Sequence, residues 1–286
     1  MPQDKQGVDA PDEWGVQGLD VDACLRRIGL AGIHRAAPSP ELLRALHRAH
    51  ATVYSHENID VVLGRTVTVD VPSVQSKLVD RHRGGNCLEL NLLFAAVLQR
   101  LGFAVTRLAG RVRMGSDIPR SRTHVMLMVD LGGRTWLADV GFGGPGLLDP
   151  LPLADGARGI QEGWGYGLRL TGDRQWVLHA DRDTADVQDP FDLYSFTLEP
   201  RYAVDYVVAN HYITTHPSSP FTGQLIVQRS LPEQRLLLRG TTLVRTWPGG
   251  KEQTEELSAA EVPGLLANEF AVVLDGADAR ALSALL

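Results

Sequence analysis

The sequence predicts a multidomain α+β protein. Apolar residues recur at helical spacing from about residue 20 to 101, strand patterns follow from Ala104 to about Phe196, and a mixed region begins near Tyr202. Runs of helices followed by runs of strands are typical of α+β folds or of separate domains. The 286 residues, 44% hydrophobic and 22% charged, can bury a sizeable core and are enough for two or three domains.

Within the helical region, a glycine pair precedes a cysteine at the expected start of a helix. Asn86 and Glu89 form a capping-box pattern, and apolar residues then recur at helical spacing. Cys87 therefore falls in the first turn, where unpaired amides and the helix dipole favour the ionised, nucleophilic sulfur. Gly84-Gly85 lets a substrate approach the backbone closely. The alternative is a buried, inert cysteine, which is what most cysteines are.

A hairpin downstream supplies a candidate base. Residues 123–140 hold two β-rich runs separated by a turn signal around Gly132-Gly133. If these glycines form the turn, Met126 faces Asp139 across the hairpin. His124 and Asp139 are then diagonal neighbours on one sheet face, about 7 to 8 Å apart at their backbones. A loop of odd length without a bulge would instead place Asp139 on the opposite face.

Each of these residues also has an ordinary structural explanation, since a lone histidine is usually a core or surface residue and an aspartate before Val-Gly-Phe-Gly can simply begin a turn. Together, Cys87, His124 and Asp139 supply a nucleophile, a base and an orienting carboxylate. That set alone does not separate peptidase, transglutaminase-like and acyltransferase chemistry.

Turn and cap signals define the remaining elements. Asp70-Val71-Pro72-Ser73 interrupts the helical region and should cap the next helix. Turns are also expected at 144–146 and 171–174. The C-terminal region should begin with a helix at Tyr202–Tyr212. Three strands should follow, at Leu225–Gln228, Arg235–Leu238 and Thr242–Trp247, and the chain should end in helices.

The chain resembles the arylamine N-acetyltransferase family from about residue 20 to the C-terminus. The resemblance rests on an ordered series of motifs: His56-Glu57-Asn58-Ile59-Asp60, Arg83-Gly84-Gly85-x-Cys87-x-Glu89, Thr123-His124, Asp139-Val140-Gly141-Phe142-Gly143 and Thr215-His216-Pro217-x-Ser219-x-Phe221. It implies acetyl-CoA as donor, an acetyl-cysteine intermediate and ping-pong transfer to arylamines, arylhydrazines or N-hydroxyarylamines.

The resemblance also implies a fold, namely a helical bundle, a β-barrel and an α/β lid around a papain-like cysteine-enzyme core. We expect the helical domain at residues 1–101, carrying the nucleophile. The barrel is expected at residues 102–200, carrying the histidine and the aspartate, and the lid at residues 201–286.

Expected donor-binding residues lie in two segments. The glycine-rich loop after Asp139 has amides that could cradle a pyrophosphate, although such a loop is more often just a tight connection. The resemblance places this loop and the 215–221 segment beside the CoA cleft. The candidates are Phe142, Gly143, Gly144, Thr215, His216 and Ser219. The chain has no Walker-type lysine, and we expect no metal.

The chain departs from the family pattern where the acceptor should bind. The family usually has phenylalanine at position 56, and often at the position after the nucleophile, where this chain has His56 and Leu88. The family's Asn-Trp-Tyr is Asn-His-Tyr here, with His211 in place of the tryptophan. We expect His56, Leu88 and Phe221 to line a less aromatic acceptor pocket that favours acceptors bearing hydroxyl or carboxyl groups.

Charge and cysteine content limit the other function classes. A net charge of -6 gives no overall basic balance for a nucleic-acid or membrane partner. Cys24 lies in a helical pattern and should be buried, so we expect Cys87 to stay free. Two free cysteines fit the reducing cytoplasm. We expect a monomer or homodimer. Two alternatives remain: an amide synthase or cysteine hydrolase using the same triad on a non-CoA acyl donor, and a catalytically silent binding protein.

Overall fold

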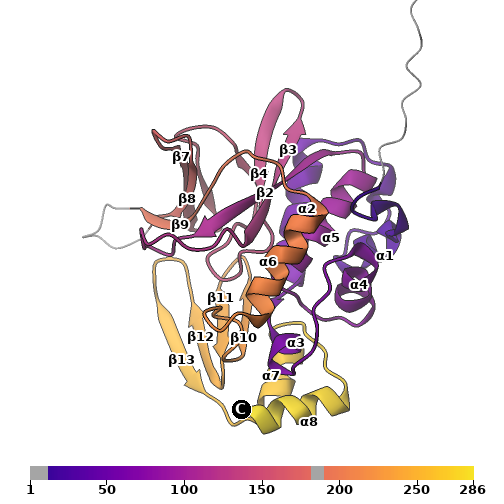
Figure 1. The fold of residues 1–286 in the computed structure, drawn as a ribbon, viewed down its shortest axis with the longest axis vertical. Coiled ribbons are helices and arrows are strands. Elements are labelled where there is room, and N and C mark those ends of the chain that lie inside the picture. The colour runs from indigo at the N-terminus through magenta and orange to yellow at the C-terminus, as the bar shows by residue number, and fades with distance from the viewer. Residues whose placement is uncertain (1–11, 182–189) are drawn as a thin grey trace, which may run out of the picture.

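Helices from the first third of the chain lie beside a curled sheet, and a C-terminal sheet with its own helices lies below both (Figure 1). The computed structural model describes residues 12–181 and 190–286, so part of the predicted strand-rich stretch, residues 182–189, lies outside the described residues. The predicted mixture of helical, barrel-like and α/β parts is confirmed.

The first part of the chain is a group of helices with one central helix among them. Side chains of Asp20, Ser39, Asp70 and Asn86 cap four of them, and the predicted cap at Asp70 is confirmed by its bond from the Ser73 amide at 2.9 Å. The helices are α1 (Val21–Arg27), α2 (Pro40–Val53), α3 (Ile59–Val62), α4 (Val71–Gln75) and α5 (Cys87–Arg100), with short helical turns η1 (Val16–Gly18), η2 (Ile33–Arg35) and η3 (Ser76–Asp80).

The second part is an antiparallel eight-stranded sheet that closes almost into a barrel. Its strand order is β5-β4-β3-β2-β9-β8-β7-β6. The strands are β2 (Ala104–Val112), β3 (His124–Leu131), β4 (Arg134–Ala138), β5 (Leu151–Pro152), β6 (Arg158–Gln161), β7 (Trp164–Leu170), β8 (Trp176–Ala180) and β9 (Phe191–Phe196).

The β3–β4 hairpin has the predicted register. Leu131 pairs with Arg134 beside the Gly132-Gly133 turn, and the ladder ends at the pair Leu127 and Ala138. Both glycines have positive φ angles, 59° and 75°, as a two-residue hairpin turn requires. Asp139 therefore follows the last paired residue of β4 directly, on the side where β3 begins with His124.

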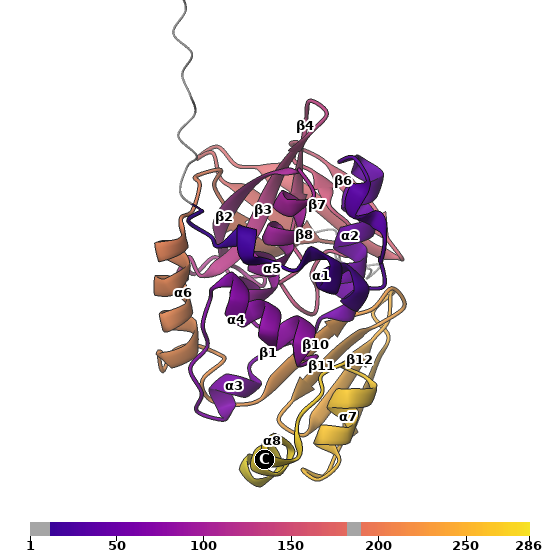
Figure 2. The same cartoon turned by 90° about the vertical axis from the view of Figure 1, so that its right-hand side faces the viewer.

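The third part contains a five-stranded sheet, order β1-β10-β11-β12-β13, and three helices (Figure 2). Its elements are α6 (Ala203–Thr215), β10 (Ile226–Ser230), β11 (Arg235–Arg239), β12 (Thr242–Thr246), β13 (Glu252–Glu256), α7 (Val262–Asn268) and α8 (Gly276–Leu285).

Two sequence-based expectations about these elements were wrong. The region expected to hold only helices, with an interruption at 70–73, contains a strand, β1 (His56–Glu57), which pairs with β10 and also bridges to Gly85. Two residues are too short for a periodic signal, and the long-range partner decides their conformation. We also missed β13, since Glu252–Glu256 is polar and exposed throughout.

Three hydrophobic clusters stabilise the molecule, and two of them draw residues from more than one part. The largest surrounds α5, whose residues from Cys87 to Leu98 are all buried, and includes inward-facing residues of β3. The others fill the barrel and the space under the C-terminal sheet, where Ile59 of α3 joins the cluster. The start of α5 consequently has packed structure on every side.

Candidate active site

Cys87 is the first residue of α5, and the predicted capping box holds it there. The Asn86 side chain accepts from the amides of Leu88 at 2.9 Å and Glu89 at 3.1 Å, while the Glu89 carboxylate accepts from the Asn86 amide at 2.8 Å. The thiol is 6% exposed, and its Sγ donates to the Thr123 carbonyl at 3.7 Å. Cys87 is thus buried beside the residue that precedes His124.

Glycine is required where the Asp139 loop meets the helix start. A Cβ at Gly141 would lie 3.0 Å from Cys87 Cα and 2.9 Å from the Cys87 carbonyl oxygen. Real Cβ atoms almost never approach backbone atoms so closely. The absence of a side chain at this position allows the loop to lie directly against Cys87.

His124 and Asp139 make the strongest contact of the site. Nε2 of His124 lies 2.7 Å from Oδ2 of Asp139, and both side chains are buried. Because Nε2 faces the carboxylate, Nδ1 is the ring nitrogen left to exchange a proton with the thiol. The rings of Phe142 and Tyr194 pack on the imidazole with centroids 5.0 and 4.8 Å away.

The electrostatics of this pair favour a charged histidine. Burial alone would lower the pKa of His124, but the Asp139 charge, its hydrogen bond and the adjacent Cys87 thiol raise it to about 10. Burial would likewise raise the pKa of Asp139, but the His124 charge and the hydrogen bonds it accepts lower it. The histidine and the aspartate are therefore an ion pair at neutral pH, with a proton available next to Cys87.

Asn91 binds Asp139 and the residues next to both His124 and Asp139, and sequence reasoning missed it. Its Nδ2 donates to the Val125 carbonyl at 2.8 Å and to Oδ1 of Asp139 at 3.0 Å, and its Oδ1 accepts from the Val140 amide at 3.2 Å. The sequence does contain a signal for this residue, because Asn91 follows Cys87 by one helical turn and so shares its face of α5.

A buried network of charges supports the turn before Cys87. Lys77 lies 2.9 Å from Glu89 and 2.8 Å from Asp60, and Arg83 lies 3.1 Å from Glu57. Burial would lower the pKa of Lys77, but the surrounding carboxylates raise it, so the lysine stays charged. These contacts fix the strand β1 and the glycine turn against the helix start.

Comparison with known proteins identifies the family. The N-acetyltransferase family model matches residues 40–279. The arylamine N-acetyltransferase of Mycolicibacterium smegmatis is 38% identical over 265 residues, which cover 90% of this chain and 93% of that protein. The chain belongs to the arylamine N-acetyltransferase family. It is an enzyme, and its class is that of the acyltransferases.

Solved structures of the family agree with this assignment. The arylamine N-acetyltransferase of Mycobacterium abscessus matches with a TM-score of 0.90 and 36% identity, covering 100% of this chain and 99% of that one. The Mycobacterium marinum enzyme, solved in complex with CoA, matches with a TM-score of 0.83 and 33% identity, covering 93% and 98%. The fold expected from the resemblance, papain-like core included, is confirmed.

The expected donor-binding residues of this N-acetyltransferase lie in different surroundings. Gly144 lines a cavity of about 560 Å³ between the barrel and the C-terminal sheet. Phe142 and Gly143 line a much smaller cavity next to Asp139. Thr215 and Ser219 use their hydroxyls locally, donating to the carbonyls of His211 and Ile213. His216 is exposed and stacks on Tyr212 at 4.5 Å.

The expected acceptor residues are also separated. The rings of His56 and Phe221 lie 5.3 Å apart, whereas Leu88 has no exposed surface and packs in the core around α5. Burial and the nearby His124 lower the pKa of His56 to about 4, so its ring is neutral. Among the described residues, Nδ1 of His56 has no hydrogen-bond partner.

Two further features concern ions and membranes. Within residues 12–181 and 190–286, no group of three or more His, Cys, Asp or Glu side chains is arranged to hold a metal ion. No helix in those same ranges has the length and apolar character needed to cross a membrane.

Proposed function

We propose that this enzyme transfers an acetyl group from acetyl-CoA to an arylamine, arylhydrazine or N-hydroxyarylamine through an acetyl-Cys87 intermediate. The observation that carries the proposal is the 2.7 Å contact of His124 with Asp139, beside a cysteine at a helix start. This arrangement supplies nucleophile, base and orienting carboxylate. Family membership supports acetyl transfer over other cysteine chemistry.

In the first half-reaction, the Cys87 thiolate attacks the thioester carbonyl of acetyl-CoA. A carbon–sulfur bond forms to Cys87, the bond to the CoA sulfur breaks, and protonated His124 gives its proton to the departing sulfur. Amides at the helix start, such as that of Cys87, have no partner within the helix and can hold the developing oxyanion.

In the second half-reaction, the neutral amine attacks the acetyl-cysteine. His124 takes a proton from the attacking nitrogen, the bond to Cys87 sulfur breaks, and the enzyme returns to its starting state. Asp139 stabilises the imidazolium in both halves without taking its proton. Donor and acceptor therefore react in turn, which is a ping-pong scheme.

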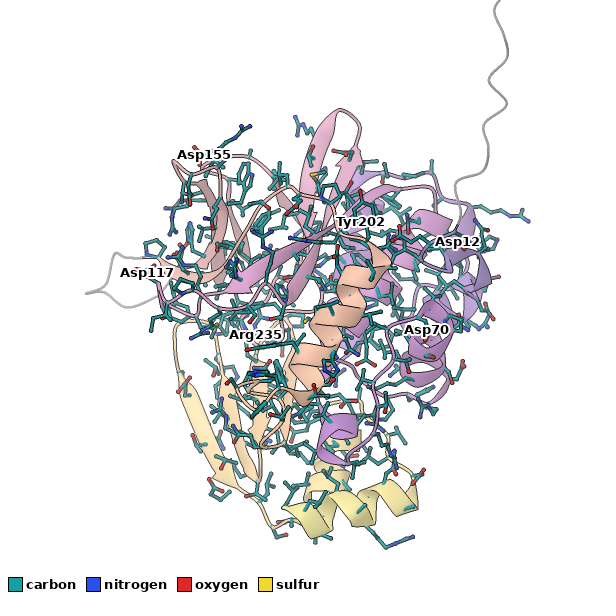
Figure 3. The ribbon with its side chains drawn as sticks, in the orientation of Figure 1. Asp12, Asp70, Asp117, Asp155, Tyr202 and Arg235 are labelled. Carbon is teal, nitrogen blue, oxygen red and sulfur yellow. The ribbon has the colours of Figure 1, made fainter. Side chains whose placement is uncertain are left out.

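The cavity of about 560 Å³ is suited to the CoA part of the donor. It has apolar walls, including Trp164, Leu237 and Val244, and it reaches the glycine-rich loop at Gly144. Arg235 and Arg239 lie along it, and Arg235 is buried at the meeting of barrel and C-terminal sheet (Figure 3). Apolar walls and a buried cation match an adenine ring and phosphates.

Intact-mass spectrometry tests the proposal directly. Mixing with acetyl-CoA should give a single acetyl adduct, mapped to Cys87 by peptide analysis, and Cys87→Ser should give none. The isolated adduct, freed of CoA, should transfer its acetyl group to added arylamine, as a ping-pong scheme requires. A wild-type chain that forms no adduct would contradict the proposal and favour an amide synthase or hydrolase acting on another acyl donor.

We also propose a cytoplasmic enzyme with small molecules as its partners, acting as a monomer or homodimer and needing no metal. Both cysteines are free, which suits a reducing compartment. Activity that survives exhaustive chelation would support the metal-free scheme.

A further inference from the structure

His47 of α2 bridges the two ends of the loop that carries Asp139. Its Nε2 accepts the Asp139 amide proton at 3.0 Å, and its Nδ1 lies 2.9 Å from the Leu148 carbonyl oxygen. An imidazole that accepts at one nitrogen and donates at the other is neutral, with its proton on Nδ1. His47 has no exposed surface, and burial lowers its pKa, which maintains that neutral form.

The Asp139 amide needs this partner. The β3–β4 ladder ends at Ala138, so the next amide along the chain receives no ladder bond from β3. Asp139 is buried, and a buried amide without an acceptor is costly. His47 provides the acceptor from a different element, α2, which lies outside the hairpin.

The segment between the two bonds is rich in glycine, and Gly143 has a φ of 81°. A chain of this composition has many accessible conformations, so its ends must be held if the carboxylate is to keep one direction. Asn91 holds the Asp139 carboxylate from α5, and His47 holds its backbone from α2. The orientation of the carboxylate in turn determines the orientation of His124.

We propose that His47 is a positioning residue, which fixes the Asp139 backbone and thereby the His124 imidazole for acyl transfer to Cys87. This inference rests on the acyl transfer proposed above. His47 touches neither the nucleophile nor the imidazole, and its effect passes through the amide of Asp139.

Two substitutions separate the two bonds of His47. In His47→Gln, the side-chain oxygen can reach the position of Nε2 and accept the Asp139 amide. In His47→Asn, the shorter amide can reach the position of Nδ1 and donate to Leu148, but the Asp139 amide is left without its acceptor. The two variants are similar in polarity and differ in which bond they can restore.

The measurement is the acetylation rate of Cys87 by p-nitrophenyl acetate, an ester too small to need the donor cavity. We expect His47→Gln to stay within about threefold of wild type and His47→Asn to lose about 10- to 100-fold, the range for an unpaired buried amide. The melting temperature of each variant is measured alongside. If His47→Asn does not fold, the folded His47→Gln variant still tests the proposal. A loss of about tenfold or more in its acetylation rate would overturn the proposal.

His50 provides the matched control. It lies one turn further along α2, is equally buried, and packs on Phe94 as His47 does. Gln and Asn at position 50 should lower the melting temperature without slowing acetylation. Rates that follow melting temperature across all four variants, or equal losses in both His47 variants, would show a merely structural role. A wild-type chain that p-nitrophenyl acetate cannot acetylate would instead contradict the proposed function.

Discussion

Asn91 joins α5 to both strands of the hairpin that carries His124 and Asp139. Its amide contacts the residue after His124, the Asp139 carboxylate and the amide of Val140, and it lies one turn below Cys87. Turning the amide over would replace these favourable contacts with repulsive ones, so its orientation is fixed. A displacement of α5 would consequently disturb base and carboxylate together.

Iodoacetamide should alkylate Cys87 much faster than Cys24. The helix start and the protonated His124 beside it favour a nucleophilic sulfur at Cys87, whereas burial raises the pKa of the Cys24 thiol to about 12. Peptide mass spectrometry after timed quenching measures the two rates, and Cys24→Ser should leave the Cys87 rate unchanged. Equal rates at the two cysteines would mean that Cys87 is not activated.

Asp139→Asn should fold but acetylate Cys87 about 10⁴-fold more slowly, the loss seen when a triad carboxylate is removed from a serine enzyme. Stopped-flow or rapid-quench acetylation measures the rate. Asp130→Asn is the matched control, because Asp130 is exposed at the turn end of the same hairpin and accepts from Thr135. A near-normal rate in Asp139→Asn would assign the orienting role to another residue.

The raised pKa of His124 predicts how stability depends on pH. The folded-state pKa of about 10 exceeds the unfolded reference of about 6.5. Its contribution to the free energy of unfolding is therefore fully present below about pH 6.5 and is lost as pH rises through about 10. The melting-temperature difference between wild type and His124→Gln should shrink from about pH 7 to about pH 11; a constant difference would mean an uncharged His124.

At the residue scale, spacing and register predicted where Cys87, His124 and Asp139 lie, while their catalytic roles stay a prediction. Cys87 followed from its capping box, and the pairing of His124 with Asp139 followed from the hairpin, because both are local patterns. Asn91 could have been found from its spacing to Cys87. His47 could not, because its contacts join elements about 90 residues apart in the chain, and no local pattern encodes them.

Strand β1 holds His56, which we propose to line the acceptor pocket. It pairs with β10 on one side and bridges Gly85 on the other, so His56 is held between the C-terminal sheet and the turn before Cys87. Nδ1 of His56 is buried without a hydrogen-bond partner, which costs free energy. A phenylalanine ring at this position would have no such unpaired atom. A ligand group that could hydrogen bond there would remove that penalty.

His56→Phe should shift acceptor preference toward unsubstituted arylamines by about 1 to 3 kcal/mol of transition-state binding, the range for a modest pocket change. The measurement is the ratio of kcat/KM for acceptors with and without hydroxyl or carboxyl groups. The structure places His211, another departure from the family pattern at the expected acceptor site, at an exposed position of α6, so His211→Phe is the control. An unchanged ratio in His56→Phe would remove position 56 from the acceptor pocket.

Helices and strands of ordinary length were predictable, and the shortest elements were not. The helix at Ala203–Thr215 extends three residues beyond the expected Tyr212, and three C-terminal strands lie within one or two residues of their expected bounds. β1 depends on pairing with a strand about 170 residues away, and β13 has no apolar face at all. Both are set by tertiary contacts that periodicity does not report.

At the scale of the whole molecule, Arg235 connects the barrel to the C-terminal sheet. From β11 it donates to the Gly144 carbonyl at 2.8 Å and to the Tyr166 hydroxyl at 2.6 Å, and its guanidinium lies over Trp164 at 4.7 Å. Three walls of the cavity proposed to bind the donor therefore meet at one buried cation. The cavity was not predictable, because it forms only when the two parts are packed together.

Arg235→Met should raise KM for acetyl-CoA by about tenfold, through loss of buried hydrogen bonds at the glycine-rich loop, while acetylation by p-nitrophenyl acetate changes little. Arg239→Met, an exposed residue of the same strand and cavity, should raise KM by less than about threefold. Steady-state kinetics with both donors measures the difference. Equal effects of Arg235→Met on both donors would mean that the residue supports the whole fold and has no specific role in the donor cavity.

The open edge of the C-terminal sheet has a consequence for behaviour at high concentration. β13 is the last strand of that sheet, and its five residues, Glu252-Gln253-Thr254-Glu255-Glu256, are all exposed (Figure 1). An unpaired edge would ordinarily be a template for another chain to add a strand, the first step of ordered aggregation. Here three of the five residues are glutamates, so an approaching β13 from a second copy would bring carboxylates close to carboxylates. The strand that hydrophobic periodicity could not predict is thus well suited to preventing edge-to-edge association of the enzyme at high concentration.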